Sequence, residues 1–272
     1  MTQATPPSYT SPTRIEPNGS FPRVERLLRT PLDRSTVVLS VLVPVYNERN
    51  TIEAIVEQVR QSPARTEIIV VNDCSTDGSH EILDRLLAER RIDQLHHQPV
   101  NQGKGAAIRK ALSMSRGDIV IVQDADLEYD PADWPALLEP ILEGKADACF
   151  GSRFLGGPHR VLYYWHSVGN KVLTTFSNSL TNLNLTDMET CYKLVRADLI
   201  KRLPLTSNRF GFEVELTARL AQAGARIWEI PISYSGRTYA EGKKITWRDG
   251  FAALFHILRY NLFVPRGAWR RR

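Results

Sequence analysis

Apolar runs and helix-spaced apolar positions alternate along the first half of the chain. Residues 37–45 and 67–72 are β-branched runs of the kind that a parallel sheet buries on both faces. Between them, apolar residues recur with the spacing of one helix face, at Ile52, Ile55, Val56 and Val59. Strand, helix and strand in this order predict a βαβ unit and therefore a parallel sheet.

The same alternation continues to residue 151. A second helix is predicted by an apolar face made of Ile82, Leu83, Leu86 and Leu87, and its N-cap is offered by Ser75, Thr76 or Asp77. Further helices are predicted at 103–115 and 131–142, and strands at 94–97, 118–123, 146–151 and 226–232. The pattern predicts an α/β fold: a mostly parallel, Rossmann-like sheet flanked by helices, with a helical and loop elaboration after residue 151.

The two ends of the chain differ from the region between them. Residues 1–36 carry six prolines among Ser, Thr and Arg, and we expect a disordered Pro-rich tail because little apolar surface is available to offset the entropy of ordering. One folded domain is expected at 37–245. Residues 246–272 predict an amphipathic helix, which either packs on the domain or rests at a membrane surface, followed by a basic tail with Arg266, Arg270, Arg271 and Arg272.

Composition narrows the classes of protein that this pattern allows. The 272 residues are 42% hydrophobic and 24% charged, which is typical of a soluble globular protein and excludes a fibrous or wholly disordered one. The net charge of +5 is too small to require nucleic acid, but it suits an anionic substrate or membrane surface. The three widely spaced cysteines, with no signal peptide and no membrane-spanning run, lead us to expect a cytoplasmic location, peripheral to the membrane if a lipid is involved.

Carboxylates follow the apolar strand predicted at 118–123. Asp124 and Asp126 lie on the same side of an extended segment, and Glu128 extends the alternation. Two or three carboxylates of this kind, completed by water and phosphate, are the usual ligands of Mg²⁺ or Mn²⁺. Ligands of open parallel sheets bind beyond the carboxyl ends of the strands, so this position favours a metal that neutralises a diphosphate.

Other uses of these carboxylates remain open. Acidic residues after a strand also cap helices. An aspartyl phosphatase places its nucleophile in a similar motif, although usually on the first strand. A calcium loop is excluded, because Tyr129 stands where that loop needs Gly and Pro135 stands where it needs Glu.

Seven motifs in a fixed order give the chain a family resemblance. They are Pro44-Val-Tyr-Asn-Glu48, Val71-Asn-Asp-Cys-Ser-Thr-Asp77, Asn101-Gln-Gly-Lys-Gly105, Asp124-Ala-Asp126, Gly151-Ser-Arg-Phe154, Asp187-Met-Glu-Thr-Cys-Tyr-Lys193 and Gly236-Arg-Thr-Tyr-Ala-Glu-Gly-Lys243. Over residues 38–260 the chain resembles family 2 glycosyltransferases of the GT-A fold. Within that family it is similar to the dolichol- and polyprenyl-phosphate mannosyltransferase branch.

The resemblance implies a binding site for a nucleotide-sugar, in which Tyr46 would contact the flat base and carboxylates would accept hydrogen bonds from the base and ribose. Its residues would be Pro44, Tyr46, Glu48, Asp73, Lys104, Asp124, Ala125, Asp126, Arg237 and Lys243. The implied cofactor is Mg²⁺ or Mn²⁺ on Asp124, Asp126 and Glu128. The nucleotide, GDP or UDP, and the hexose, mannose or glucose, stay open.

The resemblance also implies the acceptor, a polyprenyl phosphate at the membrane surface, with Arg153 and Arg160 meeting its phosphate. Catalysis would be a single displacement with inversion, carried by Asp126, Arg153, Arg237 and Lys243. An ionised phosphate acceptor needs no general base.

Two alternative functions remain. A glycosyltransferase of the same fold that acts on a soluble or glycan hydroxyl would need a base, and Glu213 and Glu215 are the candidates, although acidic residues also simply favour the start of a helix. A non-catalytic nucleotide-sugar-binding subunit is the other alternative. The complete set of metal and diphosphate residues argues against it.

Overall fold

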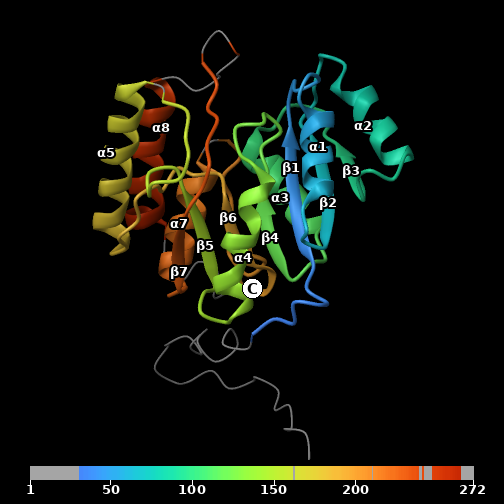
Figure 1. Cartoon of the computed structure of the whole chain (residues 1–272). Helices are drawn as coiled ribbons and strands as arrows, with labels where there is room; N and C mark the ends of the chain where they lie inside the picture. The colour runs from blue at the N-terminus through green and yellow to red at the C-terminus, as the bar shows by residue number, and fades with distance from the viewer. Residues whose placement is uncertain (1–30, 162, 210, 239–240, 242–246, 265–272) are drawn as a thin grey trace, which may run out of the picture.

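The computed structural model describes residues 31–161, 163–209, 211–238, 241 and 247–264. Their strands form one sheet (Figure 1), made of β1 (Leu39–Val45), β2 (Thr66–Asn72), β3 (Gln94–His97), β4 (Ile119–Val122), β5 (Ala148–Ser152), β6 (Lys193–Arg196) and β7 (Ile227–Pro231). The strand order is β3-β2-β1-β4-β6-β5-β7. Every pairing is parallel except those of β6 with β4 and β5, so the mostly parallel sheet that the sequence predicts is confirmed.

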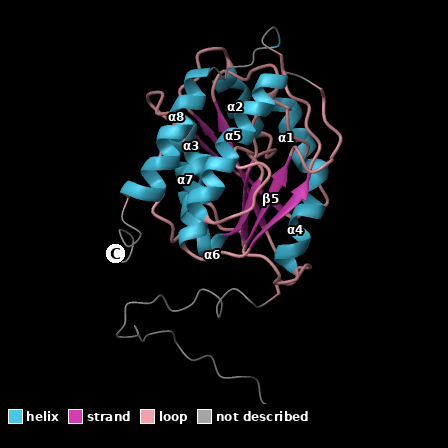
Figure 2. Cartoon of the chain, turned by 90° about the vertical axis from the view of Figure 1, so that its left-hand side faces the viewer, coloured by secondary structure: helices cyan, strands magenta, loops and turns pink. Residues whose placement is uncertain are grey.

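Helices cover both faces of this sheet. They are α1 (Ile52–Gln61), α2 (Ser79–Ala88), α3 (Lys104–Met114), α4 (Trp134–Leu142), α5 (Tyr164–Thr181), α6 (Ala197–Ile200), α7 (Phe212–Gln222) and α8 (Trp247–Leu258). A 3-10 turn at Pro131–Asp133 precedes α4, and a π-helical turn at Arg259–Phe263 follows α8. In Figure 2, α1 and α4 lie on one side of the sheet, whereas α3, α7 and α8 lie on the other.

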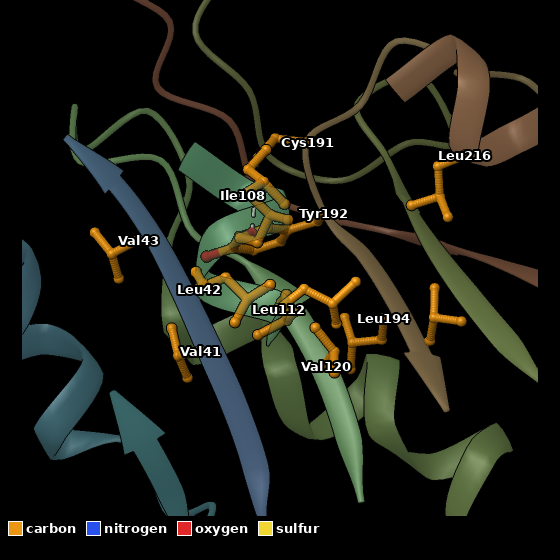
Figure 3. Packing of buried hydrophobic residues seen from close by; sticks show 14 of the residues in the cluster. Val41, Leu42, Val43, Ile108, Leu112, Val120, Cys191, Tyr192, Leu194 and Leu216 are labelled. Carbon is orange, nitrogen blue, oxygen red and sulfur yellow. Dashed lines mark hydrogen bonds between the residues drawn. The ribbon is translucent and has the colours of Figure 1, made fainter. Parts of the chain in front are cut away.

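The core follows directly from the apolar runs. Leu42 of β1 and Val120 of β4 lie on the face of the sheet that carries Leu112 of α3 (Figure 3), whereas Leu194 of β6 lies on the other face, and all four are buried. Parallel strands with helices on both faces bury both sets of side chains, which is why β1 and β4 consist almost entirely of Val, Ile and Leu. The loops beyond the carboxyl ends of β1, β2, β4 and β5 therefore meet at one edge of the sheet (upper edge in Figure 1).

The strand β6 is absent from the sequence prediction. Its ends are Lys193 and Arg196, and both are buried, so the segment lacks the apolar character of a central strand. The Lys193 ammonium is satisfied by the carbonyls of Met188 at 2.7 Å and Thr190 at 2.6 Å. Hydrogen bonds of this kind leave no recognisable pattern in the sequence, because their acceptors are backbone groups that every residue has.

The start of the folded domain needs correction. Residues 31–36, which the sequence analysis assigns to the tail, belong to the domain: the Leu32 amide donates to the Leu142 carbonyl at 3.1 Å, and Arg34 pairs with Glu139 of α4. Leu32 also packs against the core. The remainder of the predicted tail, 1–30, lies outside the described residues.

The C-terminal helix packs on the domain. Ala253, Ile257 and Tyr260 are buried, and α8 contacts both α5 and α7. The basic tail at 265–272 lies outside the described residues. Among the helices that the structure describes, none combines the length and the apolar character needed to cross a membrane.

A close backbone contact at α3 gives a stability prediction. A Cβ on Gly105 would lie 2.4 Å from the Ser207 carbonyl oxygen, so Gly105→Ala should lower the free energy of unfolding by about 2 kcal/mol because the backbones must separate. Gly169 of α5 is the matched control: a Cβ added there would meet nothing within 4 Å, and Gly169→Ala should raise stability by about 0.5–1 kcal/mol. Urea unfolding measures both, and equal effects would contradict the contact.

Candidate active site

A lysine at the start of α3 joins two acidic residues at the carboxyl edge of the sheet. The Lys104 ammonium lies 2.8 Å from Asp124 and 2.9 Å from Glu213 of α7. Burial alone would lower the pKa of Lys104, but the carboxylates of Asp124 and Glu213 outweigh it and hold that pKa well above its usual value. The lysine is therefore a fixed positive charge that neutralises the buried carboxylate of Glu213 and the half-buried one of Asp124.

The backbone around Lys104 is held by two other carboxylates. Asp73 accepts hydrogen bonds from the amides of Gln102 at 2.7 Å and Gly103 at 2.8 Å, which sets the turn where Gly103 adopts a φ of +96°. Glu215 accepts from the amides of Thr206 at 2.9 Å and Ser207 at 2.7 Å, and so fixes the loop against this turn. Both carboxylates are buried and hold the backbone that positions Lys104.

An arginine beyond β7 joins three further acidic residues. The Arg237 guanidinium lies 2.9 Å from Asp126, 3.4 Å from Glu128 and 3.5 Å from Glu48. The Arg237 amide also donates to Glu128 at 2.8 Å, and the Tyr234 hydroxyl donates to the other Glu128 oxygen at 2.7 Å. Glu128 thus holds the loop that carries Arg237.

The electrostatics of Asp126 show that this edge has an excess of negative charge. Burial, with the neighbouring carboxylates of Asp124 and Glu128, raises the pKa of Asp126 to about 7, although Arg237 acts in the opposite direction. A divalent cation would relieve that repulsion, and carboxylate oxygens are the ligands that Mg²⁺ and Mn²⁺ prefer. Asp124 and Asp126 therefore fit such a metal. Glu128 as a third ligand stays a prediction, since both of its oxygens already accept hydrogen bonds.

One other group of side chains could gather around a metal within the described part of the chain. His80, Asp84 and His97 bring their ligand atoms within 4.8 Å of one another. The two imidazole rings stack with centroids 3.7 Å apart, so their in-plane lone pairs do not converge. The Asn72 side-chain nitrogen faces His97 Nδ1 at 2.9 Å, which leaves the ring proton on Nε2, toward Asp84 at 3.1 Å. This geometry favours hydrogen bonding over metal binding.

The two arginines expected at the acceptor differ in environment. Arg153 forms a two-pronged ion pair with the fully buried Asp187, at 2.6 Å and 2.8 Å, and its guanidinium lies over the Tyr234 ring. Burial would lower the pKa of Arg153, but Asp187 outweighs this and raises it well above its usual value. Arg160 is exposed and pairs with Glu241 at 2.8 Å.

The remaining residues predicted for the nucleotide-sugar site lie at the same edge of the sheet, except one that lies outside the described residues. Pro44 is the penultimate residue of β1, Tyr46 follows this strand with 43% of its surface exposed, and Ala125 is buried between the two aspartates. Lys243 lies outside the described residues. The structure thus brings the predicted carboxylates and cations of the nucleotide-sugar site together, and it places Arg153 next to them through Tyr234.

Sequence reasoning assigned no role to Tyr234 and left Glu189 unassigned. Tyr234 links the two halves of the site, because its hydroxyl binds Glu128 while its ring lies under Arg153. Glu189 has one buried oxygen with no hydrogen-bond partner, and burial together with Glu213 raises its pKa to about 7. The signal for Glu189 was its motif, Asp187 to Lys193, whereas Tyr234 lies outside every motif.

The ion pair of Arg153 predicts a large loss of stability when it is broken. Asp187→Asn should lower the free energy of unfolding by about 3 kcal/mol, because the mostly buried guanidinium loses its counter-charge. Asp198→Asn is the control: its pair with Arg196 is 3.3 Å long and 39% of the Asp198 side chain is exposed, so the loss should stay below about 0.5 kcal/mol. Thermal and urea unfolding measure the difference, and comparable losses would contradict the structural role of Asp187.

The chain is similar to known proteins over most of its length. The model of the glycosyl transferase family 2 matches residues 40–203. An undecaprenyl-phosphate mannosyltransferase of Micrococcus luteus is 30% identical over 213 residues, which cover 74% of this chain and 85% of that protein. A polyprenol monophosphomannose synthase of Mycolicibacterium smegmatis is 30% identical over 218 residues, 77% of this chain and 82% of that one.

Solved structures support the fold. The chain is similar to glucosyl-3-phosphoglycerate synthase from Mycobacterium tuberculosis, crystallised with Mn²⁺, UDP and glucosyl-3-phosphoglycerate, with a TM-score of 0.65 and 19% identity over 86% of this chain and 83% of that one. The expected GT-A fold is confirmed. The chain belongs to glycosyltransferase family 2 and is a glycosyltransferase.

Proposed function

We propose that this glycosyltransferase is metal-dependent and inverting, and that it transfers mannose or glucose from GDP- or UDP-hexose to a polyprenyl phosphate at a membrane surface. One observation carries the proposal: fixed cations stand beside the carboxylates at one edge of the sheet. Lys104 and Arg237 lie at the two aspartates after β4, and Arg153 lies beyond Tyr234. An enzyme that joins a diphosphate donor to a phosphate acceptor needs positive charge at both.

The donor half of the site suits a nucleoside diphosphate. Asp124 and Asp126 would hold Mg²⁺ or Mn²⁺, which when bound neutralises charge that develops on the leaving diphosphate. Arg237 would then exchange its contact with Asp126 for a contact with the diphosphate, while its amide stays on Glu128. Lys243, six residues further along the sequence, is proposed for the same diphosphate. Tyr46 and Glu48 follow β1, where the base and ribose are expected.

Asp73 takes a modified role in this proposal. Both of its oxygens already accept backbone amides of the Gln102–Gly103 turn, so it acts on the nucleotide mainly by shaping that turn. Lys104 stands at the end of the same turn. The nucleotide would meet a preformed loop, which reduces the entropy lost on binding.

The acceptor half of the site suits a group that is already ionised. Glu215 is taken up by the amides of Thr206 and Ser207, and Glu213 is paired with Lys104, so neither of the two expected bases is free to accept a proton. A phosphate monoester needs no base, because its oxygen is already an anion. Arg153, held rigid by Asp187, would orient that phosphate in line with the anomeric carbon, and Arg160 would assist. The names of the two curated relatives point to the same class of acceptor.

A soluble or glycan hydroxyl acceptor is the second candidate. Glu189 favours it, since this carboxylate has an unpaired buried oxygen and a pKa raised to about 7, as a general base requires. Under this alternative Glu189 replaces Glu213 and Glu215 as the residue that accepts the proton.

The metal assignment predicts a loss of turnover at one residue. Asp126→Asn should lower kcat at saturating Mn²⁺ by at least about a hundredfold, because a neutral amide is a poor ligand for a hard cation. Asp130→Asn is the control, since Asp130 only accepts from the Ala132 amide at the 3-10 turn and its variant should keep near-normal turnover. Nucleotide release is measured for both variants, with circular dichroism to confirm folding, and normal turnover by the Asp126 variant would refute the metal assignment.

The choice of acceptor predicts how Glu213 behaves. Glu213→Gln should change kcat by less than about tenfold, whereas removing a general base costs about a hundredfold to ten-thousandfold. Lys104 keeps its contact with Asp124 in this variant, so the donor site keeps its charge. Steady-state kinetics with a polyprenyl phosphate acceptor distinguish a mechanism without a base from one in which Glu213 is the base. A hundredfold loss of kcat with KM unchanged would assign Glu213 as a base.

A further inference from the structure

The large hydrophobic side chains that the described residues expose are concentrated at one end of the sheet. Apart from Tyr46, Leu87, Val100 and Trp228, all of them lie within 154–172 or 251–263. These two segments comprise the loop after β5 with α5, and α8 with its π-helical turn. Isolated exposed apolar residues are ordinary, but a continuous group of them marks an interaction surface.

The helix α8 is apolar on two sides. Its inner side buries Ala253 and Ile257 against the domain, and Tyr260 of the π-helical turn that follows is buried as well. Its outer side carries Phe255, which is exposed by 61%, and Leu262 of the π-helical turn is exposed by 57%. A helix that only packs on its own domain has a polar outer side, so the outer apolar residues of α8 are not explained by the fold.

The helix α5 lies beside α8 and also exposes large apolar side chains. Figure 1 shows the two helices next to each other at the left end of the molecule, and they are in contact. Trp165 and Val172 of α5 are seven residues apart, which places them on one side of the helix, and they are exposed by 76% and 60%. We call Val161, Tyr164, Trp165, Phe251, Phe255 and Leu262 the apolar face.

The two segments of the chain that carry the apolar face contain basic residues and no acidic ones. Residues 152–186 and 250–272 contain no Asp or Glu, so all 30 acidic residues of the chain lie elsewhere. The same two segments contain Lys171, Arg259 and four arginines near the C-terminus of the sequence, besides Arg153 and Arg160, which pair with Asp187 and Glu241. Protein surfaces that rest in the headgroup region of an anionic bilayer typically combine Trp and Tyr with Lys and Arg.

The loop after β5 connects the apolar face to the proposed acceptor site. Arg153 is followed directly by Phe154 and Leu155, which are exposed by 46% and 41%, and the loop then runs through the exposed Val161 into α5. The apolar surface thus begins at the arginine that is proposed to bind the acceptor phosphate. A polyprenyl chain that extends from a phosphate on Arg153 would pass directly onto this surface.

We propose that the apolar face docks on the surface of a membrane that contains anionic lipids, with Trp165 of α5 and Phe255 of α8 inserted at the level of the headgroups. This docking extends the proposed function and rests on it, because the acceptor is taken to be a polyprenyl phosphate. The docked protein would bring Arg153 to the level of the headgroups, where the phosphate of that acceptor lies. The basic residues supply long-range attraction to the anionic surface, and the aromatic side chains supply the hydrophobic contact.

Vesicle binding by the full chain tests this docking surface. With vesicles of phosphatidylcholine and phosphatidylglycerol, the double variant Trp165→Ser/Phe255→Ser should have a partition coefficient at least about tenfold below that of the unmodified chain, because two inserted aromatic side chains are lost. Vesicles without phosphatidylglycerol should bind the unmodified chain about tenfold more weakly. The control is Val100→Ser/Trp228→Ser, which removes exposed apolar residues outside the apolar face and should leave the partition coefficient unchanged.

Three results would overturn the docking surface: no binding of the unmodified chain to anionic vesicles, equal binding by both double variants, or a dimer in solution that Trp165→Ser/Phe255→Ser converts to a monomer. The last would make the face an interface between two copies. Turnover of a water-soluble, short-chain polyprenyl phosphate separates this inference from the proposed function. Turnover without vesicle binding refutes the docking alone, and vesicle binding without turnover refutes the proposed acceptor alone.

Discussion

Neutralisation of buried carboxylates is the constraint on which this site depends. Parallel strands end at one edge of the sheet, and the acidic residues that follow them are forced together there in a partly dry environment. Like charges at such distances cannot all remain ionised without counter-charges, as the raised pKa of Asp126 shows. Lys104, Arg237 and Arg153 supply those counter-charges from three different parts of the chain.

The same cations explain how stability and activity are linked. Each is held by at least one carboxylate that no ligand needs to displace: Glu213 for Lys104, Glu128 for Arg237 and Asp187 for Arg153. A cation anchored in this way costs little reorganisation when phosphate oxygens arrive, and preorganised charge is the largest contribution that a protein makes to this class of reaction. The packing of the Ser207 carbonyl against Gly105 and the hold of Asp73 on Gly103 serve the same purpose for the backbone.

The sequence predicted the parts of this molecule that depend on local pattern. The apolar runs before Tyr46, Asp73 and Asp124 indicated the strands, and the alternation of Asp124 and Asp126 indicated where charge would gather. It missed β6 because this short strand begins and ends with the charged residues Lys193 and Arg196, which are buried although their type predicts exposure. It offered Glu215 as a base because an acidic residue at a helix start looks the same whether it faces a ligand or, as here, two backbone amides. The predicted end of the N-terminal tail at residue 36 was wrong because Leu32 contacts α4 across more than a hundred residues of chain, and a contact of this kind has no local pattern.

Two phosphate-binding halves are proposed to meet at this edge, one for a diphosphate donor and one for a phosphate acceptor. A transfer assay tests this most directly, with the purified chain, Mn²⁺ or Mg²⁺, GDP- and UDP-hexoses and a short polyprenyl phosphate, and with lipid product and released nucleotide followed separately. We expect one lipid-linked sugar of inverted anomeric configuration for each nucleoside diphosphate released. Nucleotide released without a sugar lipid, and with the sugar transferred instead to a hydroxyl acceptor when one is supplied, would contradict the phosphate acceptor and point to Glu189 as a base.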